Sequence, residues 1–137
     1  MDDANDGVRK TDDEWRASLT AAQYRVLRER GTEPAWSHPY NTEHRHGQYV
    51  CAGCGAPLFS SEAKFESGSG WPSYFAVIDG AVDTTVDRGH GMVRTEMHCR
   101  QCGGHLGHVF DDGPAPTGLR YCTNGTSLRF IPNEPGE

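Results

Sequence analysis

The 137-residue sequence has no long hydrophobic run, no excess of positive charge and no apolar segment near its start. Hydrophobic residues make up 35% of the chain and never form a stretch that could span a membrane as a helix. The formal net charge of −6 at pH 7 argues against a nucleic-acid partner, because no basic field exists to attract phosphates. The polar N-terminal stretch lacks the apolar core of a secretory signal, which predicts a cytoplasmic protein.

Apolar residues are also scarce at the two ends of the chain. Residues 1–10 are rich in Asp and Asn, and we expect them to form a disordered tail, with a second short tail at 133–137. The segment between them, 11–132, is long enough to bury a core and is expected to fold as one domain. Nothing in the sequence requires more than a monomer.

Helical patterns are confined to residues 11–30. Thr11–Glu14 and Thr20–Gln23 each match a capping box, in which a Thr hydroxyl and a Glu or Gln side chain satisfy free amides at a helix start. Gly31 occupies the position of a C-terminal cap, so the second helix should end near Arg30. These two helices are expected to be short.

From Thr32 onward the sequence has no helical period, and glycine, proline and short β-prone runs take over. The segment Ile78–Ala81 separates two of these runs as a tight hairpin turn would. The spacing predicts a mainly β fold of antiparallel sheet, with the N-terminal helices packed outside. The expected strands are 47–51, 74–78, 81–86, 92–98, 107–110, 119–123 and 126–131.

Five cysteines in a chain expected in a reducing compartment indicate metal binding and catalysis rather than a disulfide framework. Four of them form two C-x-x-C-G motifs, each of which can present two sulfurs from one tight turn. The glycine after the second cysteine lets the backbone turn sharply. Four thiolates suit a tetrahedral zinc ion and leave no open position, so we expect one structural zinc. Its ligands would be Cys51, Cys54, Cys99 and Cys102.

Two local redox pairs or an iron–sulfur cluster remain alternatives for these motifs. His98 and His105 lie close enough to the second motif to replace a thiolate, but four cysteines already fill the shell. The other histidines upstream are expected at the solvated surface (His38, His44 and His46) or are undecided between a turn and a site (His90).

The fifth cysteine, Cys122, has no obvious structural role. If residues 119–123 form a strand, Arg120 and Cys122 project from the same face, and a guanidinium beside a thiol favours the thiolate. His105 and His108, one loop upstream, can donate or relay a proton near neutral pH. An isolated cysteine is more often a buried apolar filler. The arginine and the paired histidines favour a nucleophilic or redox cysteine instead.

The loop at 65–74 contains two glycines but lacks the spacing of a phosphate-binding loop. It places Trp71 after the glycines and before Pro72, which allows a rigidly held, exposed indole that forms an apolar wall for a small hydrophobic group. The alternative is that Trp71 and Tyr74 are core aromatics at the start of a strand.

These motifs resemble those of the type B, R-specific methionine sulfoxide reductases. The similarity extends from about Asp12 to Pro132 and rests on motifs in a fixed order: GTEP (31–34), the two cysteine motifs, SGSGWPSY (67–74), HGM (90–92), HLGHVFDDGP (105–114), and RYCTN followed by SLRF (120–130). The resemblance implies a mainly β fold of two antiparallel sheets, of the β-tent or barrel type, with short helices and a structural zinc. It also implies reduction of methionine-R-sulfoxide, mainly in proteins, to methionine.

The same resemblance implies roles for individual residues. Cys122 would attack the sulfoxide sulfur, and Trp71 would cage the terminal methyl group, with Phe110 also in the substrate site. Attack leaves methionine and a cysteine sulfenic acid, and the sulfoxide oxygen must be protonated because it is otherwise a poor leaving group. By the resemblance, the oxygen is bound or protonated, directly or through water, by His105, His108 and Asn124, and the pKa of the thiol is lowered by Arg120.

The chain departs from the family in lacking a resolving cysteine. Many members have one in the glycine loop, where this chain has Ser69, and another subgroup has one just after GTEP, where this chain reads AWS (35–37). We therefore expect the sulfenic acid at Cys122 to be reduced directly by thioredoxin or a small thiol. A smaller departure is GT (125–126), beside the expected site, where the family more often has Ser-Ala, and we make no prediction for its effect.

Two other functions fit parts of the sequence. A non-enzymatic, zinc-stabilised β domain could bind a protein or ligand through an aromatic pocket, but it would not need a thiol beside Arg120 and two histidines. A thiol–disulfide oxidoreductase could use one C-x-x-C pair, but zinc-bound thiolates cannot cycle freely. The sequence favours the reductase over both.

Overall fold

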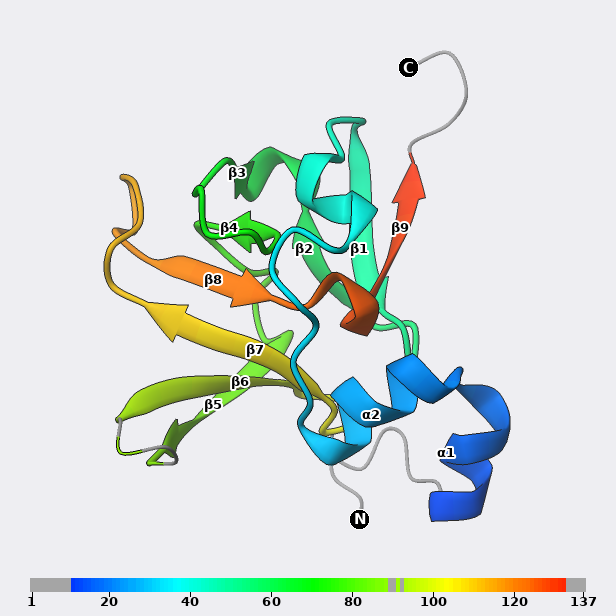
Figure 1. The fold of residues 1–137 in the computed structure, drawn as a ribbon. Helices are drawn as coiled ribbons and strands as arrows, with labels where there is room; N and C mark the ends of the chain where they lie inside the picture. Colours follow the sequence, from blue (N-terminus) through cyan, green and yellow to red (C-terminus); the bar gives the residue numbers. More distant parts are fainter. Residues whose placement is uncertain (1–10, 89–90, 92, 133–137) are drawn as a thin grey trace.

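The computed structural model describes residues 11–88, 91 and 93–132, so the expected tails and His90 lie outside the described residues. Within these residues two antiparallel sheets lie side by side, and two helices pack at one end of them (Figure 1). The strands are β1 (Gly47–Cys51), β2 (Pro57–Ser60), β3 (Lys64–Phe65), β4 (Ser73–Tyr74), β5 (Val82–Asp87), β6 (Arg94–Cys99), β7 (His105–Phe110), β8 (Arg120–Thr123) and β9 (Leu128–Pro132). The smaller sheet has the order β2-β1-β9, and the larger has the order β3-β4-β8-β7-β6-β5. The expected mainly β, antiparallel fold is confirmed.

The two helices are α1 (Asp12–Ser18) and α2 (Ala21–Glu29), and neither is long and apolar enough to cross a membrane. Both expected capping boxes are formed, by Thr11 with Glu14 and by Thr20 with Gln23. The C-terminal cap of α2 differs from the prediction, because Arg30 and not Gly31 takes the left-handed conformation, with φ 57°. Gly31 is needed for a close approach instead, since a Cβ there would lie 2.9 Å from the Arg25 carbonyl oxygen.

The core between the sheets is aromatic. Tyr49 and Phe130 come from the smaller sheet and lie 4.8 Å apart between ring centroids. Phe59, also from the smaller sheet, stacks on Tyr74 of the larger sheet at 4.2 Å with an interplanar angle of 10°. All four side chains are buried. Burial of this much apolar area is the main term that holds the two sheets together.

The strand prediction is wrong in one region. Of the expected strand 74–78 only Tyr74 belongs to a sheet, as the last residue of β4, and β2 and β3 lie outside the expected strands. The residues after Tyr74 leave the larger sheet because their amides bond elsewhere: Phe75 donates to Ala63 and Ile78 to Leu58, both at 2.9 Å. The turn at Ile78–Ala81 exists but does not join two paired strands, so the hairpin prediction is also wrong.

Candidate active site and metal site

The two C-x-x-C-G motifs form matching hairpin turns, one at the end of each sheet. Cys51–Gly55 leads from β1 into β2, and Cys99–Gly103 leads from β6 into β7. In each turn the glycine amide donates to the carbonyl of the first cysteine, at 2.8 Å and 2.7 Å. Gly55 and Gly103 have φ of 81° and 79°, which a residue with a Cβ rarely adopts. The expected role of these glycines is confirmed.

The four sulfurs of these turns meet in one cluster. Cys51 lies 3.7 Å from Cys102 and Cys54 lies 3.6 Å from Cys99, measured between sulfurs, and all four sulfurs lie within 4.8 Å of one another. A tetrahedral ion held at about 2.3 Å would place its sulfur ligands about 3.8 Å apart. The cluster therefore fits a metal ion with four thiolate ligands.

The metal cluster ties the smaller sheet to the larger one, and the helices cover it. A Cβ at Gly104 would lie 2.8 Å from Leu27, and one at Gly53 would lie 3.2 Å from Trp15, so both turns pack against helix side chains. Arg28 donates to the Cys102 carbonyl at 3.0 Å. The helices predicted to pack outside the sheet thus have a specific place, over the cysteine turns.

Cys122 lies in β8, in the middle of the larger sheet. Its Cα pairs with Ser73 of β4 on one side and His108 of β7 on the other. Phe110 pairs with Arg120, two residues before the cysteine, so all of these side chains lie on one face of the sheet. The expected common face for Arg120 and Cys122 is confirmed.

A bulge in β7 adds His105 to the same face. Met97 pairs with Gly107 and His98 pairs with His105, so β7 has one extra residue, Leu106, at this point. Without it, His105 and His108 would lie on opposite faces, because side chains alternate along a strand. The bulge is therefore what places both histidines on the side of the sheet that carries Cys122.

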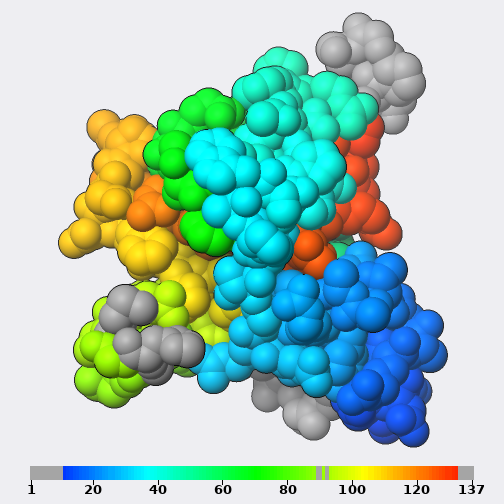
Figure 2. All heavy atoms as spheres, in the orientation of Figure 1, coloured from blue at the N-terminus to red at the C-terminus, as the bar shows by residue number. Residues whose placement is uncertain are grey.

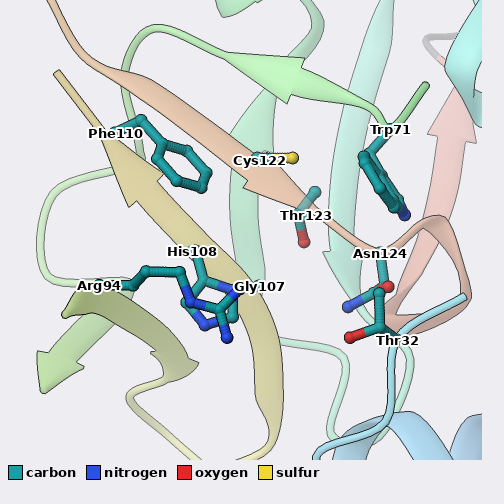
Figure 3. A pocket seen from close by; sticks show the side chains of 9 residues that line it. All are labelled: Thr32, Trp71, Arg94, Gly107, His108, Phe110, Cys122, Thr123 and Asn124. Carbon is teal, nitrogen blue, oxygen red and sulfur yellow. The ribbon is translucent and has the colours of Figure 1, made fainter. Parts of the chain in front are cut away.

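A cavity of about 110 Å³ opens beside the thiol on this face. In Figure 3, Cys122 lies between the rings of Phe110 and Trp71, with His108 and Arg94 below it. The lining residues come from five separate parts of the chain: Thr32, Trp71, Arg94, Gly107, His108, Phe110, Cys122, Thr123 and Asn124. Four of the predicted site residues and the predicted wall Trp71 meet here.

The thiol has neighbours that act on its pKa in opposite directions. Burial raises the pKa of Cys122 above its ordinary value, while Arg120 and a hydrogen bond with Ser69 lower it. Arg120 interacts with two other residues as well: it makes a two-point ion pair with Asp112 (2.8 and 3.1 Å) and lies 4.3 Å over the Phe110 ring. Arg120 thus acts in the predicted direction, but burial outweighs it in the free protein.

His108 is held by a carboxylate that the sequence analysis did not single out. Its Nε2 lies 3.0 Å from Asp87, and the same carboxylate oxygen accepts from Arg94 at 3.2 Å. Asp87 pairs with Arg94 across β5 and β6, on the face that carries His108. The Nε of Arg94 is buried and has no hydrogen-bond partner among the described residues. Charged residues inside β-prone runs were the signal that could have identified this group.

His105 lies behind the cavity wall and is not among its lining residues. Its Nδ1 is 2.7 Å from Glu96, which also makes a two-point ion pair with Arg30 at 2.6 and 3.0 Å. Burial lowers the pKa of His105, against the effect of the carboxylate. The ring centroids of His105 and His108 are 5.7 Å apart. Contact of His105 with the substrate oxygen stays a prediction.

Glu33, from the GTEP motif, ties together the residues that hold the cavity. Its amide donates to the Asn124 Oδ1 and its carbonyl accepts from the Trp71 indole, both at 2.9 Å. Its buried carboxylate accepts from the amides of Gly125 and Thr126 (3.0 and 2.9 Å) and from the Thr126 hydroxyl (2.7 Å). The departure at GT (125–126) thus supplies one extra bond to this carboxylate.

The surface prediction for the upstream histidines is confirmed for two of three. His44 and His46 are exposed. His38 is half-buried, with its ring against Gly125, where a Cβ would lie 2.4 Å away, so the prediction for His38 is wrong. Its Nδ1 accepts from the Tyr40 amide at 3.1 Å, and burial lowers its pKa. The sequence around His38 is polar, yet the His38 ring packs on Gly125 in the loop after Cys122.

Comparison with known proteins gives one consistent result. The SelR domain family model matches residues 19–132. Three similar proteins carry the name peptide methionine sulfoxide reductase MsrB. The one from Thiobacillus denitrificans is 58% identical over 126 residues, covering 91% of this chain and 96% of the relative. Those from Leptospira interrogans and Acinetobacter baumannii are 57% and 53% identical, covering 90% and 95% of this chain and 95% and 94% of the relatives.

Proposed function

The chain belongs to the SelR domain family and is a peptide methionine sulfoxide reductase, and on this premise we propose how its own residues carry the reaction. Cys122 is the nucleophile, and the substrate is the R-sulfoxide of a methionine in a protein or peptide. The observation that carries this proposal is that Cys122 lines the cavity, whereas the other four cysteines lie together in the metal cluster.

The cavity binds the end of the methionine sulfoxide side chain. The terminal methyl group packs on the Trp71 indole, which is fixed by its bond to Glu33, and Phe110 closes the opposite side. The oxygen faces the polar side, where Asn124 keeps one N–H after donating to the Leu106 carbonyl at 2.9 Å. Opposed contacts to methyl and oxygen on a chiral sulfur give selectivity for one sulfoxide.

The reaction moves the oxygen from one sulfur to the other. The Cys122 thiolate attacks the substrate sulfur and forms a sulfur–sulfur bond. The protonated oxygen passes to the Cys122 sulfur as its bond to the substrate sulfur breaks, and cleavage of the sulfur–sulfur bond releases methionine and leaves a sulfenic acid on Cys122. The substrate sulfur is reduced by two electrons and the cysteine sulfur is oxidised by two. His108, directly across from Cys122 and held by Asp87, donates the proton that makes the oxygen a leaving group. His105 acts behind it, through His108 or a water.

The raised pKa of Cys122 is compatible with this reaction. Substrate entry brings a polarised sulfoxide next to the thiol, and proton transfer to the oxygen can accompany loss of the thiol proton. Arg120 and Ser69 then stabilise the thiolate as it forms. In the free protein Cys122 is therefore mainly in the thiol form, which reacts more slowly with other oxidants than the thiolate does.

The sulfenic acid is reduced by an external thiol, such as thioredoxin or a small thiol. Ser69, which stands where many relatives have the resolving cysteine, cannot form a disulfide, and the other four cysteines lie together as a set that could hold a metal ion. We assign zinc to that set because four thiolates at these distances suit it. Zinc there would stabilise the fold. Its thiolates fit the reducing environment of the cytoplasm, where we place the protein as a monomer.

The test uses two peptides that differ only in the configuration of the sulfoxide. With excess dithiothreitol, we expect turnover of the R form and loss of that turnover by more than about 10³-fold in Cys122→Ser, with the fold and the metal retained. Equal turnover of the S form would refute the stereochemical assignment. Activity that persists in Cys122→Ser would refute the nucleophile.

A further inference from the structure

Trp36 has two properties that do not stabilise the fold. Its side chain is 66% exposed, and its backbone has φ 66°. The left-handed conformation is unfavourable for a residue with a Cβ, and it is rare for a bulky side chain. Backbone outliers of this kind gather at binding and catalytic sites. A large exposed indole held in such a conformation indicates a role outside the folded core.

Trp36 lies against the wall of the substrate cavity. Its amide donates to the Gly70 carbonyl at 2.7 Å, and its indole covers Gly70, where a Cβ would lie 3.0 Å from the Trp36 Nε1. Gly70 stands between Ser69, which lowers the pKa of the Cys122 thiol, and Trp71, which lines the cavity. The exposed indole is therefore next to the residues that contact the reacting group.

The segment that carries Trp36 is held by hydrogen bonds in the free protein. Ser37 bonds twice to the Pro34 carbonyl, through its amide at 3.3 Å and its hydroxyl at 2.6 Å. The preceding Glu33 is buried and holds both Trp71 and the loop after Cys122. Figure 2 shows this segment in cyan, crossing the front of the molecule beside the yellow and orange of β7 and β8. A rigid aromatic side chain loses little entropy when it binds a partner.

The cavity is small, so most of a peptide substrate would lie outside it, next to Trp36. A cavity of about 110 Å³ takes the end of one side chain, so the backbone and the neighbouring residues of a peptide remain outside it. We infer that Trp36 is a docking subsite for an apolar side chain that flanks the oxidised methionine in a peptide or protein substrate. This inference rests on the proposed function and names the substrate contact that lies beyond the sulfoxide. Apolar contact with a fixed indole is its source of affinity.

The test compares Trp36→Gly with the unchanged protein on three R-sulfoxide substrates, with dithiothreitol as the reductant. The substrates are a peptide with leucine on both sides of the sulfoxide, the same peptide with serine there, and free methionine sulfoxide. We expect kcat/KM for the leucine peptide to fall at least about fivefold through KM, and to fall less than about twofold for free methionine sulfoxide. The preference for leucine over serine should disappear.

Two controls separate docking from structural damage. Glycine accepts positive φ, so Trp36→Gly should keep or raise the unfolding temperature. Ile131→Ser removes another exposed apolar side chain (45% exposed), on β9 of the smaller sheet, and should leave the leucine preference intact.

Three results would overturn the inference. An equal loss on all three substrates would mean that Trp36 only positions the cavity wall, and no loss on any would remove its role. A loss seen only when thioredoxin replaces dithiothreitol would assign the surface to the reductant. Absence of activity on every sulfoxide in the unchanged protein would refute the proposed function itself, and is distinguishable from all three.

Discussion

The five cysteines of this protein lie in two sites with different surroundings for the sulfur atom. In the four-cysteine cluster, each sulfur has three others within 4.8 Å. Cys122 has a hydroxyl, a guanidinium and a cavity as neighbours instead. The first arrangement makes a thiolate a ligand and removes it from redox chemistry, and the second leaves the sulfur open to one substrate.

The two sites also differ in how the chain builds them. The metal cluster needs only two tight turns, and each turn is a run of five residues. The proposed active site is a cavity lined by residues from separate parts of the chain, among them Thr32, Trp71, Arg94, His108 and Cys122. Damage to the cluster should therefore remove the fold and the activity together, whereas damage at the cavity should remove activity and leave most of the stability.

The largest effect is expected from Cys99→Ala. It removes one of four thiolate ligands, and binding of a structural zinc contributes on the order of 10 kcal/mol to folding in small domains. We expect loss of bound zinc and a large fall in the unfolding temperature, measured by metal analysis and thermal denaturation. Cys122→Ser is the matched control, because it removes a thiol from the other site and should keep zinc. If Cys99→Ala kept zinc and its unfolding temperature, the cluster would not be structural.

An intermediate effect is expected from Glu33→Gln, because Glu33 bonds to Trp71, Asn124 and the loop after Cys122. Glu33→Gln replaces one carboxylate oxygen by an NH2 group, so a backbone amide of Gly125 or Thr126 that is now paired loses its acceptor and faces another donor. We expect a loss of about 3 kcal/mol in the free energy of unfolding, with a lower kcat, measured by urea denaturation and steady-state assay.

The milder partner of that variant is Thr126→Val, which removes only the hydroxyl bond to Glu33. We expect a loss of about 1 kcal/mol in the free energy of unfolding and a small change in kcat. A Glu33→Gln protein as stable and active as the parent would show that this carboxylate does not hold the active site.

The smallest effect is expected in the titration of Cys122. Its pKa is raised by burial, so the reactive thiolate is the minor form at neutral pH. The rate of alkylation should therefore keep rising with pH at values where an ordinary cysteine is already fully ionised. Arg120→Met removes a group that lowers the pKa and should shift the midpoint up. Asp112→Asn removes a group that raises it and should shift the midpoint down.

The measurement is the rate of iodoacetamide modification of the peptide that contains Cys122, from pH 6 to about pH 10. Shifts of the same sign in both variants would contradict the opposed roles of Arg120 and Asp112. A response of the metal-cluster cysteines in place of Cys122 would contradict the division of the cysteines between the two sites.

The sequence was sufficient for features that depend on near neighbours. Both capping boxes and both cysteine turns formed as expected, because their hydrogen bonds join residues within one turn of chain. The common face of Arg120 and Cys122 followed from strand alternation alone. The sequence was not sufficient for 75–78, where the amides of Phe75 and Ile78 bond to the Ala63 and Leu58 carbonyls of a segment whose structure it did not predict.

By itself, the sequence determined which residues carry chemistry: four cysteines for a metal, and a fifth beside an arginine. Tertiary structure alone decided how those groups act. The bulge at Leu106 set the face of His105, burial set the direction of the Cys122 pKa shift, and Asp87 and Glu33 became the supports of the site. The physical reason is that residue type and short-range hydrogen bonding are local, whereas strand register, burial and the partner of a buried charge depend on segments far apart in the chain.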